Sequence, residues 1–71
     1  MSMAHQIIRR TFHRVAKRGV VRCDGRLWQV TQDGKPVSGK VVMHVNVNHP
    51  YAEFPDDRFS RLNVEEIGRT Q

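Results

Sequence analysis

The basic side chains near the start of the chain are the residues whose types and spacing best suit the binding of a partner. The stretch IIRRTFHRVAKRG, residues 7–19, contains five arginines and lysines and one histidine but no acidic residue. Such groups bind phosphates, and each phosphate of DNA or RNA that they neutralise releases bound counterions. The stretch therefore predicts nucleic-acid binding, and the candidate residues, extended to residue 26, are Arg9, Arg10, His13, Arg14, Lys17, Arg18, Arg22 and Arg26.

The positive charge of the chain is concentrated in its first third. Residues 1–26 contain seven lysines and arginines against one acid, whereas residues 27–71 contain five against six acids. Like-charged pairs four residues apart on a helix cost a few tenths of a kcal/mol each. A surface that only needs to be soluble would therefore mix the two signs. The alternative interpretation is a solvated face that carboxylates from the second part of the chain balance in the fold, namely Glu53, Asp56, Asp57, Glu65 or Glu66.

No pattern in the chain points to catalysis, to a metal or to a cofactor. Cys23 is the only cysteine, it lies beside a predicted turn, and its side chain is expected to face the core. The four histidines show no spacing typical of paired metal ligands, and the glycines stand singly rather than in a phosphate-binding loop. We therefore expect no enzyme activity, no catalytic residue, no metal and no cofactor.

A second candidate surface lies in the segment HPYAEFPDD, residues 49–57, which is predicted to be a loop. Its two aromatic residues stand beside acidic residues that would repel phosphate. The segment thus suggests contact with a protein, through Tyr51, Phe54, Asp56 and Asp57. The alternative function is a protein-interaction module, an adaptor or inhibitor of the kind that mobile elements carry. It would dock its basic helix or the Tyr51–Phe59 loop on an acidic protein.

The basic residues are expected to lie on an amphipathic helix that covers residues 3–18. On a helical wheel the charged residues occupy one half and the weakly polar and apolar residues the other, the latter being Ala4, Ile7, Ile8, Thr11, Phe12, Val15 and Ala16. Gly19 follows at the position of a left-handed C-cap. Because no second long helix is predicted, a helix-turn-helix is not expected. Binding would be dominated by the phosphate backbone.

After Gly19 the hydrophobic period changes to two, which predicts strands at about 20–24, 26–32, 36–48 and 58–62. Asp24-Gly25 and Asp33-Gly34 are typical of tight hairpin turns. A two-residue loop at the first would pair Cys23 with Arg26 and Val21 with Trp28, so the inward residues of this hairpin would be Val21, Cys23, Trp28 and Val30. In the third strand Val41, Met43, Val45 and Val47 are expected to face the core, as are Phe59 and Leu62 further on. Asn63 and the following VEEIG predict a helical turn at 63–68.

These elements together predict a single small α+β domain over residues 1–71. Its N-terminal amphipathic helix would pack on a strongly twisted antiparallel sheet or open barrel of about four or five strands, followed by the short helical turn. A chain of this size buries little surface, which leaves a homodimer open. We expect a cytoplasmic, non-enzymatic accessory or regulatory protein whose partner is DNA or RNA, or an acidic protein surface, and not a membrane.

Overall fold

The part of the chain that the structure describes is built from antiparallel strands. The computed structural model describes residues 11–70, except for the side chains of residues 57–59. Its strands form one 7-stranded sheet in the order β1-β5-β6-β7-β3-β2, with β4 added to β3. Their bounds are β1 (Phe12–Ala16), β2 (Val20–Cys23), β3 (Arg26–Gln32), β4 (Lys35–Pro36), β5 (Gly39–His44), β6 (Tyr51–Phe54) and β7 (Asp57–Arg69).

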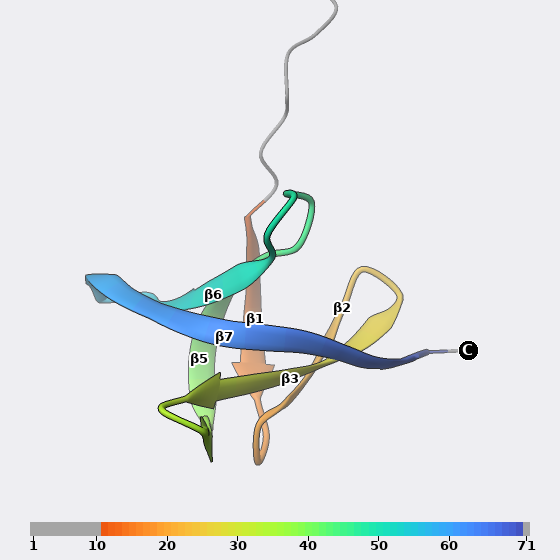
Figure 1. Ribbon diagram of the computed structural model, residues 1–71, viewed down its shortest axis with the longest axis horizontal. Helices are drawn as coiled ribbons and strands as arrows, with labels where there is room; N and C mark the ends of the chain where they lie inside the picture. The colour runs from red at the N-terminus through yellow and green to blue at the C-terminus, as the bar shows by residue number, and fades with distance from the viewer. Residues whose placement is uncertain (1–10, 71) are drawn as a thin grey trace, which may run out of the picture.

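The sheet curls into a nearly closed barrel, in which β1 and β5 run across the direction of β3 and β7 (Figure 1). The two ends of the sheet, β1 and β2, meet at the tight turn that joins them. There Lys17 and Val20 exchange both backbone hydrogen bonds, at 2.9 and 3.0 Å. Beyond this pair β1 and β2 separate, which leaves an open seam in the barrel.

The predicted N-terminal helix is wrong in the part of the chain that the structure describes, and the fold is therefore not α+β. Residues 12–16 form β1, which pairs with β5 from Phe12 opposite Met43 to Ala16 opposite Gly39. Phe12 and Ala16 are four residues apart, so a helix and a strand both place them on one face. Val15 distinguishes the two, because the helix would bury it and the strand leaves it 66% exposed. Residues 3–10 of the expected helix lie outside the described residues.

The predicted helical turn at 63–68 is also wrong, because β7 continues to Arg69. It pairs with β3, with Val30 opposite Val64 and Thr31 opposite Asn63. The local capping signal at Asn63 is overridden because the ladder with β3 satisfies the same backbone groups. The segment predicted as a loop at 49–57 contains β6, which joins β5 to β7 and buries Ala52.

The predicted hairpin turns are confirmed. Cys23 pairs with Arg26 and Val21 with Trp28 across Asp24-Gly25, and Gln32 pairs with Lys35 across Asp33-Gly34. Both residues of each turn have positive φ, as a type I′ turn requires.

The core forms where the inward residues of these strands meet. The predicted inward residues of the first hairpin are all buried, and Trp28 Nε1 donates a hydrogen bond of 3.1 Å to the Cys23 carbonyl. Val47, expected in the core, is 37% exposed because β5 ends at His44. Leu62 is buried as predicted, while the side chain of Phe59 lies outside the description. The buried residues are Ala16, Val21, Cys23, Trp28, Val30, Val37, Val41, Met43, Val45, Ala52 and Leu62.

Candidate nucleic-acid interface

Six exposed basic residues come together on β1, on the turn that follows it, on β2 and on the neighbouring strand β5. We call this surface the basic face and define it as His13, Arg14, Lys17, Arg18, Arg22 and Lys40. Lys40 belongs to it because it lies opposite Val15 in the β1–β5 ladder. Among the residues that the structure describes, none of the six forms an ion pair with a carboxylate. The carboxylates of the second part of the chain therefore do not pair with this surface in the described structure.

Arg14 bridges the seam between β1 and β2. Its Nε donates a hydrogen bond of 3.2 Å to the Arg22 carbonyl, and one terminal nitrogen donates to the His13 carbonyl at 2.9 Å. Its guanidinium carbon also lies 5.4 Å from the centre of the Phe12 ring. A guanidinium carries five N–H donors, so Arg14 is fixed in place and keeps donors for an anion.

The turn that joins β1 and β2 is held rigidly on the barrel. The backbone N–H of Arg18 donates to Ser38 Oγ at 3.1 Å, and that of Gly19 donates to the Val37 carbonyl at 2.8 Å. Gly19 is buried against Pro36, so a Cβ built on it would lie 2.9 Å from the Pro36 Cβ. These contacts anchor the backbone that carries Lys17 and Arg18.

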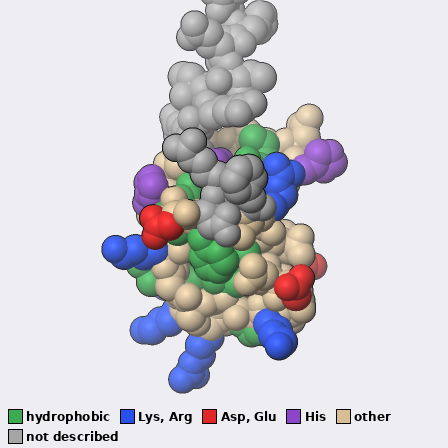
Figure 2. All heavy atoms as spheres, turned by 90° about the vertical axis from the view of Figure 1, so that its left-hand side faces the viewer, with side chains coloured by type: hydrophobic (Ala, Val, Ile, Leu, Met, Phe, Trp, Pro, Cys, Tyr) green, Lys and Arg blue, Asp and Glu red, His purple; other side chains and the backbone are tan. Residues whose placement is uncertain are grey.

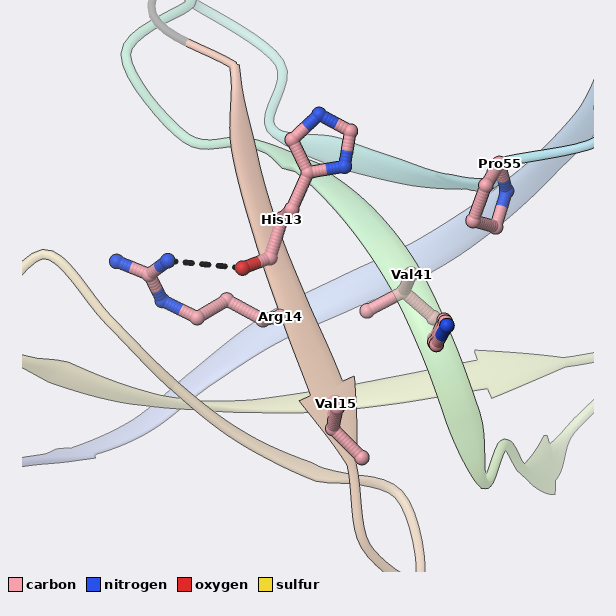
Figure 3. Close-up of a pocket in the computed structure, with 6 residues that line it drawn as sticks. His13, Arg14, Val15, Val41 and Pro55 are labelled. Carbon is pink, nitrogen blue, oxygen red and sulfur yellow. Dashed lines mark hydrogen bonds between the residues drawn. The ribbon is translucent and has the colours of Figure 1, made fainter.

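Two hollows flank β1 and share Arg14 and Val15 in their linings. On the β2 side a hollow of about 510 Å³ is also lined by Lys17, Val20, Arg22 and Leu27. On the β5 side a hollow of about 320 Å³ is also lined by His13, Lys40, Val41 and Pro55. Figure 3 shows His13 and Arg14 pointing away from β1 in opposite directions. Neither lining includes an acidic side chain, so both hollows suit an anionic partner.

The end of the barrel that carries the β1–β2 turn is also basic when seen from another side. In Figure 2, Lys and Arg side chains project from the lower end of the molecule, where Figure 1 places the β1–β2 and β3–β4 turns. The acidic side chains visible in this view lie above these basic side chains. Basic side chains thus gather at the lower end of the barrel on this side too, although another lies near its upper end.

Arg26 is separated from the basic face by its own ion pairs. It contacts Asp24 at 3.0 Å and Glu66 at 3.5 Å, and its guanidinium lies 4.7 Å from the centre of the Trp28 ring. It is half-buried, and its charge is balanced within the chain, which is typical of a structural role. Of the other predicted residues, Arg9 and Arg10 lie outside the described residues.

The residues of the predicted protein-binding loop do not form a free aromatic pair. The ring of Tyr51 stacks on His44 with centroids 4.6 Å apart, and the Arg61 guanidinium lies 4.0 Å from the ring centre. His44 also contacts Glu53 at 2.8 Å. Phe54 packs against the core and Asp56 is exposed, while the side chain of Asp57 is not among those that the structure describes.

Cys23 is buried, and its environment keeps the thiol protonated. Burial raises the pKa of Cys23 above its ordinary value of 9.0, and Asp24 adds to this effect while Arg14 and Arg26 oppose it. Among the described side chains no group of three or more His, Cys, Asp and Glu residues is placed to hold a metal ion. Residues 11–70 also contain no helix long and apolar enough to cross a membrane.

Comparisons of the chain with protein-family models, with curated proteins and with solved structures found no match.

Proposed function

We propose that this protein is a small, non-enzymatic nucleic-acid-binding protein with an accessory or regulatory role in the cytoplasm. Its basic face contacts the phosphate backbone of DNA or RNA. The observation that supports this most directly is the exposure of five lysines and arginines and a histidine on adjoining strands, without an ion-paired carboxylate among the described residues. Each contact with a phosphate would release counterions, which favours binding at low salt.

The rigidity of the basic face supports the same function. Lys17, Arg18 and Arg22 are carried by a hairpin whose turn is hydrogen-bonded to two other segments of the barrel. Ordering a flexible backbone on binding costs conformational entropy, and a backbone already held in place avoids that cost. The backbone of the interface is therefore largely ordered before the partner arrives.

Charge reversal on the basic face tests this proposal. We expect Arg22→Glu and Lys17→Glu each to weaken binding to an oligonucleotide at low salt by about tenfold or more, because each replaces an attraction to phosphate by a repulsion. The measurement is fluorescence anisotropy with a labelled oligonucleotide. Urea unfolding of each variant checks that the exposed substitution leaves the fold intact.

Arg69→Glu is the matched control, since it changes the net charge by as much as Arg22→Glu does. Its side chain is 81% exposed and lies 3.8 Å from Glu66, outside the basic face. We expect it to change affinity far less than Arg22→Glu. An equal loss in both variants would show that only the net charge matters, and no binding by the unaltered protein would refute the proposal.

A protein partner is the second candidate, and the exposed apolar residues that lie among those of the basic face favour it. Val15 is 66% and Val20 is 40% exposed, and both line the hollow on the β2 side of β1. Aliphatic side chains among cations would suit an acidic protein segment that also carries apolar residues. If oligonucleotides do not bind while an acidic peptide with apolar residues does, in a way that Val15→Ser abolishes, this second function replaces the first.

A further inference from the structure

We infer that the basic face recognises a double-stranded nucleic acid, with β1 lying along a groove and the cations on its two sides contacting phosphates of opposite strands. This inference rests on the proposed function and narrows its ligand to a duplex.

The first observation is that the cations lie on both sides of β1. Lys40 and His13 line the hollow towards β5, whereas Lys17 and Arg22 line the hollow towards β2. Val15 lies between them, because it lines both hollows and is one of the most exposed apolar residues of the described chain. The surface thus has an exposed valine and Arg14 at its centre, with further cations towards β5 on one side and towards β2 on the other.

The dimensions of this arrangement suit two rows of phosphates. Hydrogen-bonded strands lie about 4.8 Å apart, as β5 and β1 do, whereas β2 separates from β1 beyond the Lys17–Val20 pair, so Lys40 and Arg22 stand at least roughly 10 Å apart across β1. The grooves of B-form DNA are about 6 and 12 Å wide, which brings two phosphate rows within reach of such a pair of sides. A single strand offers only one row, and it would leave one side of β1 without a partner.

The second observation is that the described aromatic rings are not available to unpaired bases. Proteins that bind single strands usually stack bases on exposed aromatic side chains. Here Trp28 is buried, Phe12 is half-buried beside the Arg14 guanidinium, and Tyr51 lies between His44 and Arg61. Phe54 packs against the core. The described surface therefore favours the backbone of a duplex over the bases of a single strand.

The test compares duplex DNA and duplex RNA of one sequence with their separated strands, for the unaltered protein and for Lys40→Glu, Arg22→Glu and the double variant. We expect at least one duplex to bind about tenfold more tightly than its strands. With that duplex, the slope of log K against log salt gives the number of phosphates contacted. Each single charge reversal should lower this number by about one, and the double variant should lower it by about two.

Two results would overturn the inference and leave the proposed function standing. In the first result, the unaltered protein binds duplexes and single strands with equal affinity, and Arg22→Glu weakens the binding of both. The second is duplex binding that Lys40→Glu leaves unchanged, because one side of β1 would then suffice. If no oligonucleotide binds, the proposed function itself fails, so the two failures are distinguishable. Arg69→Glu again serves as the control for net charge.

Discussion

Arg18 has a backbone conformation that ordinarily favours glycine, asparagine or aspartate. Its φ is 52°, and it is followed by Gly19 with a φ of 80°. The corresponding first positions of the two Asp-Gly turns are Asp24 and Asp33, which tolerate this left-handed region better than arginine does. A cation thus stands at a position where local stability favours another residue, which fits a role in binding rather than in folding.

Replacing Arg18 with asparagine should therefore separate stability from binding. We expect Arg18→Asn to raise the free energy of unfolding by roughly 0.5–1 kcal/mol, because asparagine is less strained in the left-handed region. The same variant should bind oligonucleotides more weakly, since one cation of the basic face is lost. Urea unfolding and anisotropy measure the two effects. Arg18→Lys is the control and should change neither by much, whereas a less stable Arg18→Asn, or one that binds as tightly as the parent, would contradict this account.

At the level of single residues, the sequence predicted the exposed cations of β1 and β2 but not their partners. Arg26 was grouped with them, although it pairs with Asp24 two residues away and with Glu66 from a distant strand. The sequence pattern does not indicate Lys40, because its place beside β1 depends on its pairing with Val15 in the β1–β5 ladder. A count of charges shows neither the contact of Arg26 with Glu66 nor the position of Lys40 beside Val15, since both depend on how the strands pair.

At the level of elements, the turns whose chemistry is local were predicted correctly. Asp24-Gly25 and Asp33-Gly34 set the register of their hairpins because their residues suit positive φ. The turn at Arg18-Gly19 has the same geometry but lacks the usual first residue, so Gly19 was interpreted as a helix cap. The short β1 then looked helical, because Phe12 and Ala16 satisfy both periodicities.

The late strands were predicted only in part, for a different reason: the strand expected at 58–62 is the first part of β7, whereas β6 and the second part of β7 were not expected as strands. β6 lies between two prolines of the sequence, and only its pairing with β5 and β7 shows that Tyr51–Phe54 is extended. In β7, the bulge opposite Leu27 and Trp28 interrupts the simple alternation of side chains. Long-range pairing decides both elements, and it leaves little trace in a local pattern.

A prediction at the level of elements concerns Gly19, which packs the β1–β2 turn against β4. Gly19→Ala should destabilise the fold more than Gly34→Ala. Both residues have a φ near 80°, but a Cβ at Gly34 meets nothing within 4 Å, whereas one at Gly19 lies 2.9 Å from the Pro36 Cβ. In both variants an alanine in the left-handed region lowers the free energy of unfolding by about 1–2 kcal/mol. In Gly19→Ala, overpacking against Pro36 lowers it by about 1–3 kcal/mol more. Equal urea midpoints for the two variants would contradict the close packing of this turn.

At the level of the whole molecule, the described ion pairs leave the charge unevenly distributed. Glu66 and Asp24 are engaged with Arg26, and Glu53 is engaged with His44. Arginines and lysines on β1, its turn, β2 and β5 have no such partner among the described residues. The fold thus engages several of its acids with Arg26 and His44 rather than with the residues of the basic face, and this separation of charge is the central physical claim behind the proposed function.

The salt dependence of binding tests that claim most directly. For a duplex held by the five lysines and arginines of the basic face, the logarithm of the association constant should fall linearly with the logarithm of the salt concentration, with a slope of up to about −4.5. Lys17→Glu should make this slope shallower by about one, and Arg69→Glu should leave it unchanged. A slope near zero, or one that Lys17→Glu does not alter, would contradict the account.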